Sequence, residues 1–237
     1  MLQGFVPYPP ECAARYRARG YWQDKSLAQE FNSVYARFSD RTALVDGDVS
    51  LSYADLDRLS TNLALNLLEI GLQPLDRVVP TLPNVHEFVV LYFALQKIGA
   101  IPIAALVTHR YAEISQFVNL SGATTCVYPD VMGDFHFSPV IDRVAAENTA
   151  LRIRIVLGQA KPGEHSLREL IDRPAQLPAS RLAEIAIDPT DPCIFQLSGG
   201  TTGIPKLIPR TNNDYAYNSK VAASVCEVDA ESVLLLV

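Results

Sequence analysis

The order of apolar and polar positions along the chain predicts helices that alternate with strands. In the expected helices, apolar residues recur every three or four positions. These helices span 26–38, 52–70, 85–99, 108–122, 139–148, 166–170 and 215–228. Short apolar and β-branched runs predict the strands. These span 42–53 (a hairpin), 76–82, 100–106, 123–130, 151–158, 193–197, 206–210 and 232–237. The alternation between residues 76 and 158 indicates right-handed βαβ crossovers, a largely parallel sheet and helices on both of its faces.

Polar residues and prolines mark the expected ends of these elements. The candidate helix N-caps are Ser26, Ser52 (with Asp55), Asn84 (with Glu87), Thr108, Asn212, Asn213 and Asp214. Gly71 suits the end of the helix 52–70, because glycine adopts the left-handed conformation that follows many helices. Pro80 cannot donate a ladder hydrogen bond, so it predicts that the strand 76–82 lies at an edge or contains a bulge.

Composition shifts divide the chain into three parts. Residues 1–25 are rich in proline, arginine and aromatic residues and are expected to form an irregular arm, with its arginines on a solvated face. Residues 26–192 are expected to form an α/β subdomain, whose last segment, 175–192, is a connecting loop with three prolines. Residues 193–237 are then the start of a next subdomain. Because the strand expected at the end needs cover on both faces, we expect the sequence to be part of a larger protein, truncated at 237.

The overall charge excludes some functions and leaves one kind of local site open. The chain has 237 residues, 49% of them hydrophobic, and a net charge of −6. A general nucleic-acid binder would show a basic face, so no nucleic-acid partner is expected, whereas a local loop can still bind an anion. No apolar run approaches the ~20 residues of a membrane helix, and the first 20 residues lack a secretory signal. We therefore expect a cytoplasmic protein without a membrane partner.

The cysteines and histidines give no sign of a disulfide framework or metal site. Cys12, Cys126, Cys193 and Cys226 lie far apart without a C-x-x-C pair, so reduced and mostly buried thiols are expected. The histidines are dispersed among different elements at positions 86, 109, 136 and 165. His109 follows a predicted strand, where ligands gather in parallel sheets, but is expected to be a surface residue at a helix start. No metal site is expected.

A run of small residues after the strand 193–197 has the composition of a phosphate-binding loop. It consists of Ser198, Gly199, Gly200, Thr201, Thr202 and Gly203, and Lys206 follows three positions later. Backbone N–H groups in glycine-rich turns can point inward and bind an anion. The hydroxyls add donors, one of them a candidate Mg²⁺ ligand, and the lysine adds a positive charge. These groups suit a triphosphate or a departing pyrophosphate. The plainer alternative is a glycine-rich hairpin without a ligand.

The Walker loop, G-x-x-x-x-G-K-[ST], is a poor match. Here Pro205 precedes the lysine and Leu207 follows it. The segment "KLIPR" is expected to be a strand, so the context is strand–loop–strand. This argues against a P-loop kinase or GTPase.

The string "LSGGTTGIPK" resembles the phosphate loop of the adenylate-forming superfamily, which includes acyl-CoA synthetases, luciferases and the adenylation domains of nonribosomal peptide synthesis. The longer "FQLSGGTTGIPKLIPRTNNDY", the N-terminal "GFVPYPPECAARYRARGYWQDKSLAQEF" and "YFALQKIGAIPIAAL" extend the resemblance over essentially the whole chain. It is closest to the stand-alone 2,3-dihydroxybenzoate–AMP ligases of siderophore biosynthesis.

The resemblance implies an ATP- and Mg²⁺-dependent ligase that activates 2,3-dihydroxybenzoate or salicylate as aryl-AMP. The aryl group then passes to the phosphopantetheine thiol of an aryl carrier protein. By position, Ser198 to Gly203 and Lys206 are the loop around the β- and γ-phosphates. Lys206 is the charged residue expected to act in adenylation. Tyr215 and Tyr217 are expected to be packing residues.

The family's proteins are more than twice this long, and their aryl pocket, adenine-binding segment, Mg²⁺-ligating glutamate and catalytic C-terminal lysine follow the phosphate loop. We therefore expect the 237 residues alone to be inactive. Two alternatives stay open. One is another adenylate-forming enzyme, such as an acyl-CoA synthetase, and the other is a non-catalytic nucleotide-binding or partner-binding domain.

Overall fold

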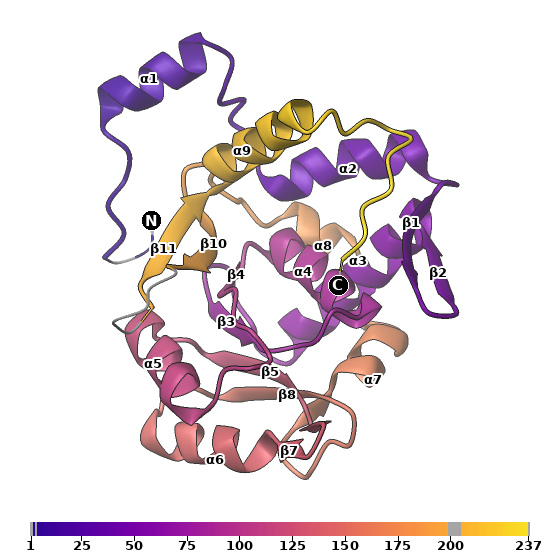
Figure 1. Ribbon diagram of the computed structural model, residues 1–237, viewed down its shortest axis with the longest axis vertical. Coiled ribbons are helices and arrows are strands. Elements are labelled where there is room, and N and C mark those ends of the chain that lie inside the picture. Colours follow the sequence, from indigo (N-terminus) through magenta and orange to yellow (C-terminus); the bar gives the residue numbers. More distant parts are fainter. Residues whose placement is uncertain (1, 3, 199–204, 237) are drawn as a thin grey trace.

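A parallel sheet forms the centre of the molecule (Figure 1). The computed structural model describes residues 2, 4–198 and 205–236. Within them, the central sheet has the strand order β4-β3-β5-β8-β9, and every neighbouring pair in it is parallel. The strands are β3 (Arg77–Pro80), β4 (Ile101–Pro102), β5 (Thr125–Pro129), β8 (Ile153–Leu157) and β9 (His165–Ser166). The predicted α/β fold with a largely parallel sheet is confirmed.

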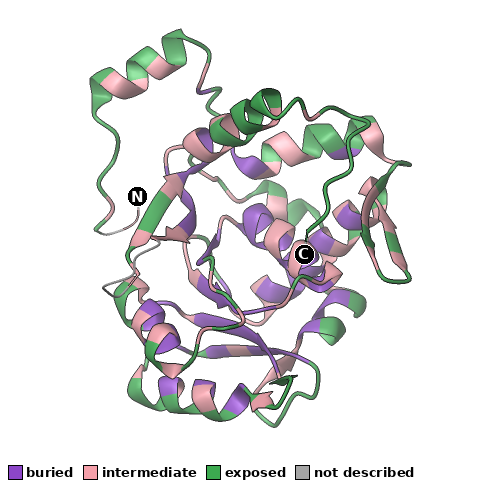
Figure 2. Ribbon diagram, viewed as in Figure 1, coloured by how far each residue is buried: buried purple, intermediate pink, exposed green. Residues whose placement is uncertain are grey.

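Helices cover both faces of this sheet. The helices α3 (Tyr53–Glu69), α4 (His86–Ile98) and α7 (Leu167–Asp172) lie on one face, and α5 (Tyr111–Ser121) and α6 (Ser138–Glu147) on the other. Successive strand residues point to opposite faces, so Val78 packs with α3 and α4 whereas Val79 packs with α5. Both faces of the sheet are therefore buried, as Figure 2 shows by the purple strands. This explains why these strands have continuous apolar sequences.

Further elements surround this core. They are α1 (Pro10–Ala18), α2 (Leu27–Phe38), the hairpin of β1 (Thr42–Asp46) and β2 (Val49–Ser52), the ribbon of β6 (Val131–Met132) and β7 (Phe135–His136), α8 (Ser180–Ala183), the hairpin of β10 (Pro192–Leu197) and β11 (Leu207–Thr211), and α9 (Asn212–Val225). Helix α9 lies beside α2 (Figure 1), and the ion pair between Lys220 and Glu30, 2.7 Å long, joins the two. None of the described helices has the length and apolar character that a membrane crossing needs.

Local polar residues start some helices as predicted, and distant ones start others. Ser26 and Ser52 are the N-caps as predicted, and both form capping boxes, of which only the one at Ser52 was predicted. Gly71 has a φ of 99° after α3. The prediction for Asn84 is wrong. Helix α4 begins at His86, whose backbone N–H donates to a carboxylate oxygen of Asp46, 40 residues earlier, at 2.9 Å. A carboxylate brought in by the fold satisfies the helix end, and the local sequence does not show it.

The predictions for two further helix starts are also wrong. Helix α5 begins at Tyr111 with Arg110 as N-cap, in place of Thr108. Helix α9 is capped by Thr211, whose hydroxyl accepts from the backbone N–H of Asp214. Threonine is strand-forming as well as capping, and here it is both the last residue of β11 and the cap.

Three predicted segments differ in the structure. The arm 1–25 contains the helix α1, because Pro10 takes the first helical position, where its missing N–H is not needed. The loop 175–192 contains the short α8, and the strand predicted over 100–106 shortens to β4.

Pro80 lies in an inner strand, which corrects the prediction of an edge or bulge. The next residue, Thr81, donates its N–H to Val127 on β5, so position 80 faces β4. The β3–β4 ladder ends at the pair Val78 and Pro102, before it reaches Pro80. No ladder hydrogen bond is lost there.

The strand predicted over 232–237 is absent from the described part of this segment. Val233, Leu234, Leu235 and Leu236 are 72–94% exposed and pair with no strand among the described residues. An apolar run forms a strand only where its backbone groups pair with a neighbour, and within the described residues this segment joins no sheet.

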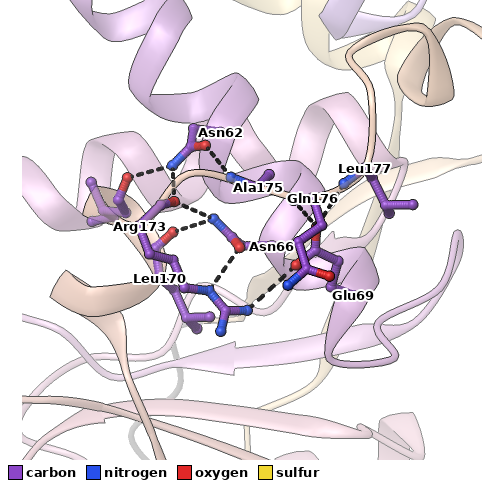
Figure 3. A network of polar contacts seen from close by, with 9 residues as sticks. Asn62, Asn66, Glu69, Leu170, Arg173, Ala175, Gln176 and Leu177 are labelled. Carbon is purple, nitrogen blue, oxygen red and sulfur yellow. Dashed lines mark hydrogen bonds and ion pairs between the residues drawn. The ribbon is translucent and has the colours of Figure 1, made fainter.

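A polar network fixes the chain that leaves α7 to helix α3 (Figure 3). Asn66, fully buried, donates to the carbonyl oxygens of Leu170 and Arg173 at 2.9 and 3.0 Å. Its own oxygen accepts from the Arg173 guanidinium at 2.8 Å. Asn62 adds bonds to Arg173 and Ala175. The network satisfies the carbonyls that α7 leaves unpaired at its end.

Candidate functional site

The glycine-rich segment connects the strands β10 and β11 of one hairpin. Its antiparallel ladder ends at the pair Leu197 and Leu207. Just beyond, the Ser198 N–H donates to the Lys206 carbonyl at 3.0 Å, and the Lys206 N–H donates to the Ser198 hydroxyl oxygen at 2.9 Å. We call this pair, Ser198 and Lys206, the neck. The predicted strand–loop–strand context is confirmed.

The neck brings together two of the predicted phosphate-binding residues. The others, Gly199, Gly200, Thr201, Thr202 and Gly203, lie outside the described residues, and their role stays a prediction. Lys206 is exposed and forms no ion pair with any residue that the structure describes. Its charge is therefore available to an anion at the neck.

The second cation of the hairpin is already neutralised. Arg210 on β11 forms an ion pair with Asp214 at the start of α9 and donates to the Gln196 side chain on β10 at 3.0 Å. The arginine therefore ties both strands to the helix. Tyr8 lies close to this pair, and burial together with the Asp214 carboxylate raises the pKa of its hydroxyl. Of the two cations on the described part of the hairpin, Arg210 therefore has a structural role and Lys206 has no acidic partner.

The hairpin lies beside β4, the edge strand of the parallel sheet, with its neck toward the carboxyl end. Phe195 on β10 forms a parallel bridge with Ile103, just after β4, and its carbonyl accepts from the Ala104 N–H at 2.9 Å. The Gln96 side chain of α4 donates to the Cys193 carbonyl at 3.0 Å. Ligands of parallel α/β sheets bind at this end. The structure thus places the neck beside the usual ligand-binding edge.

A cavity of about 190 Å³ lies between this hairpin, α4, α9 and the ends of β3 and β4. It is lined by Pro80, Phe88, Leu91, Tyr92, Leu95, Pro102, Ala104, Ile194 and Tyr215. Burial raises the pKa of both tyrosines. The lining is apolar and offers no cation, so it does not suit a phosphate. Sequence reasoning missed this cavity, because its lining comes from five separate segments.

The other residues weighed from the sequence have structural partners. Tyr217 stacks on Tyr21 with ring centroids 4.5 Å apart, and Tyr215 is half-buried, so both pack as predicted. His109 is half-buried, with its ring against Phe117 at 5.1 Å and its Nδ1 accepting from the Leu106 N–H. This burial lowers the pKa of His109. The imidazole belongs to the turn before α5, so the predicted place at a helix start is confirmed, but the residue is half-buried and not on the surface.

The four cysteines are free thiols, but they are less buried as a set than predicted. Cys126 and Cys193 are buried, Cys12 is partly exposed and Cys226 is exposed. Burial raises the pKa of the Cys126 thiol to about 12 and raises that of Cys193 as well. The two buried thiols are unreactive at neutral pH.

One cluster of side chains has donor atoms close enough for a metal ion. It joins Asp46 on β1 with His86 and Glu87 at the start of α4. The His86 Nδ1 lies 2.9 Å from an Asp46 oxygen and 3.3 Å from a Glu87 oxygen. Arg168 also pairs with Glu87 at 2.7 Å. These partners satisfy the two carboxylates, so we interpret the cluster as an ion-pair network that stabilises the start of α4.

The family profile and the individual relatives that match this chain point to the same kind of enzyme. The sequence profile of the AMP-binding enzyme family matches residues 31–237. The chain is 39% identical to the salicyl-AMP ligase / salicyl-S-ArCP synthetase of Mycobacterium tuberculosis over 100% of this chain and 42% of that protein. It is 36% identical to the 2,3-dihydroxybenzoate-AMP ligase of Bacillus subtilis over 99% of this chain and 42% of that protein.

A solved structure shares the fold. The apo structure of MbtA from Mycobacterium smegmatis superimposes with a TM-score of 0.87 at 37% identity, over 97% of this chain and 42% of that one. The chain therefore spans about two fifths of the length of the relatives it matches. Because the family profile covers all but the first 30 residues, the chain belongs to the AMP-binding enzyme family.

Proposed function

We propose that the chain corresponds to the N-terminal part of an ATP-dependent aryl-acid–AMP ligase, with 2,3-dihydroxybenzoate or salicylate as the acid. The observation that carries the proposal is the neck, where the exposed Lys206 forms no ion pair with any described residue and its backbone N–H donates to the Ser198 hydroxyl. The names of the Mycobacterium tuberculosis and Bacillus subtilis relatives support the choice of acid. The reaction would serve siderophore biosynthesis in the cytoplasm.

In the proposed reaction, a carboxylate oxygen of the aryl acid attacks the α-phosphorus of ATP. The new O–P bond gives aryl-AMP, and the bond to the β-phosphate breaks and releases pyrophosphate. We assign the glycine-rich segment and Lys206 to the β- and γ-phosphates, whose negative charge grows as the bond breaks. The phosphopantetheine thiol of an aryl carrier protein then attacks the aryl carbonyl, forms a thioester and releases AMP.

Magnesium would accompany the ATP phosphates. It prefers hard oxygen ligands and keeps several waters. The Ser198 hydroxyl fits this preference, because its oxygen accepts only the Lys206 N–H among the described residues. We propose Ser198, Thr201 and Thr202 as the protein groups nearest the ion.

The test separates binding from turnover. We expect the 237-residue chain to bind ATP·Mg²⁺ in calorimetry but to catalyse no exchange of pyrophosphate into ATP, since it spans 42% of the relatives' length. A longer protein that carries this sequence should show exchange that depends on 2,3-dihydroxybenzoate or salicylate. Exchange by the 237 residues alone would contradict this division of function. Transfer to coenzyme A in place of a carrier protein would indicate an acyl-CoA synthetase.

A further inference from the structure

The N-terminal arm is tied to the base of the phosphate-loop hairpin. The Asp24 N–H donates to the side-chain oxygen of Asn213 at 3.0 Å, and the Asn213 side-chain N–H donates back to the Asp24 carboxylate at 2.8 Å. The two residues are 189 positions apart. Asn213 is only 2% exposed, so this reciprocal pair satisfies a buried amide.

A second buried asparagine joins both ends of the hairpin to the same junction. Asn212, 3% exposed, accepts from the Leu27 N–H at the start of α2 at 3.0 Å. It donates to the carbonyl of Asp191, directly before β10, at 3.2 Å. The start of α2, the entry to β10 and the exit from β11 therefore meet at one point.

Asp24 holds a backbone conformation that few residues adopt. Its φ is 52°, in the left-handed region, which aspartate tolerates better than most residues. Arg17 on α1 donates to both oxygens of its carboxylate at 2.7 and 3.0 Å. Arg17 and Asn213 lower the pKa of Asp24, so the carboxylate is charged at neutral pH. The turn is thus held from α1 on one side and from α9 on the other.

Aromatic side chains make the other described contacts of the arm. Helix α1 contains no buried residue and lies apart from the main body in Figure 1. Trp22, 6% exposed, packs within the arm, with its ring 5.0 Å from that of Tyr8 and 5.4 Å from that of Tyr16. Tyr8 in turn lies close to the ion pair of Arg210 and Asp214. Tyr21 adds its stack on Tyr217 of α9. The arm therefore docks as a small unit onto α9, the helix that follows the hairpin.

We propose that Asp24 and Asn213 are positioning residues for phosphate binding, with the docked arm fixing the base of the hairpin whose far end is the neck. The proposal rests on the proposed function of that neck. The ladder between base and neck runs from the pair Pro192 and Thr211 to the pair Leu197 and Leu207, with one irregularity near the base. Its orientation at the base thus sets the positions of Ser198 and Lys206.

Because coupling between two binding events is mutual, the proposal can be tested by measuring how phosphate changes the docking of the arm. If arm docking favours phosphate binding, phosphate binding must favour arm docking by the same factor. Trp22 is the single tryptophan of the chain and lies in the arm, so acrylamide quenching of its fluorescence measures docking. We expect pyrophosphate·Mg²⁺ to reduce the quenching of Trp22 in the 237-residue chain. A purely structural arm would show no such response.

The variants separate the arm from the neck. We expect Asn213→Ala and Arg17→Ala to weaken pyrophosphate binding about five-fold or more in calorimetry and to abolish the response of Trp22. Arg15→Ala is the matched control, because Arg15 lies exposed on the same helix and forms no ion pair among the described residues. Asp24→Asn keeps the left-handed preference but weakens the contact with Arg17, so we expect an intermediate loss. Circular dichroism verifies that each variant is folded.

The outcomes distinguish this proposal from the function on which it rests. Pyrophosphate binding by the unaltered chain without any change at Trp22 would overturn the positioning role alone. The same holds if Arg17→Ala, whose side chain is exposed enough for the fold to survive its loss, releases the arm and keeps full affinity. No binding of ATP or pyrophosphate by the unaltered chain would overturn the proposed function and this role together.

Discussion

At the scale of single residues, Lys206 carries the sharpest prediction. Its side chain is exposed and unpaired among the described residues, whereas Arg210 is neutralised by Asp214. A charge-assisted contact to phosphate contributes about 1.5–3 kcal/mol, and solvent screening places an exposed lysine at the lower end. We therefore expect Lys206→Ala to weaken binding of ATP·Mg²⁺ about ten-fold, measured by calorimetry, and to slow adenylation in a longer protein that carries this sequence.

The control for this prediction is Lys161→Ala. Lys161 is also exposed and lies in the loop between β8 and β9, away from the hairpin. The affinity for ATP should be unchanged in this variant, and Lys206→Arg should retain most of it. Equal affinities for Lys206→Ala and the unaltered chain would assign the lysine to solvent.

Residue roles were predictable where both partners are close in sequence. The capping boxes at Ser26 and Ser52 need only the residue three positions on, and both form. Asn212 and Asn213 are residue types that often cap helices. In the structure, however, Asn212 bonds to the start of α2 and Asn213 bonds to the arm. Such partners depend on the whole fold, so the local pattern pointed to the wrong role. Thr211 became the cap instead.

At the scale of elements, the network on α3 is expected to contribute strongly to stability. Asn66→Ala removes three hydrogen bonds and leaves two carbonyls and the Arg173 guanidinium without this partner (Figure 3). Because Asn66 is fully buried, we expect a loss of about 2–4 kcal/mol in the free energy of unfolding. Urea denaturation followed by circular dichroism measures it.

A matched asparagine serves as the control. Asn119 on α5 is exposed, and its side chain makes one long bond, 3.4 Å, to Ser115. Asn119→Ala should change the free energy of unfolding by less than about 0.5 kcal/mol. A loss for Asn66→Ala no larger than that for Asn119→Ala would show that water replaces the network at little cost.

Elements were predictable from periodicity when they were long or buried on both faces. The helices α3 and α4 and the strands β5 and β8 follow their sequence patterns closely. The prediction failed at prolines, which occur both in irregular segments and at particular positions of helices and strands. Proline at position 10 starts a helix in a segment expected to be irregular, and proline at position 80 lies in an inner strand because the neighbouring ladder stops short of it.

At the scale of the whole molecule, the site is assembled from segments that are distant in sequence. The strand β10 joins the edge of the parallel sheet through Phe195, and α9 carries the arm. The composition of the glycine-rich segment and its position between two strands could be predicted from the sequence. The contacts that hold the hairpin in place, at Ile103, Asp24 and Leu27, could not be predicted, because they form only when the chain is folded. The division into 26–192 and 193–237 stays a prediction, and contacts of this kind join the two parts.

The exposed apolar segment 233–236 carries the last prediction. Its four side chains are 72–94% exposed in one continuous stretch, and such stretches favour association between molecules. We expect the 237-residue chain to self-associate as its concentration rises, and sedimentation velocity measures this. The double variant Leu234→Gln/Leu236→Gln should remain monomeric at concentrations where the unaltered chain does not. Val45→Gln is the control, because Val45 is 66% exposed on β1 but lies between the less exposed Leu44 and Asp46, and this variant should associate like the unaltered chain. Equal association of the double variant and the unaltered chain would place the contact elsewhere on the surface.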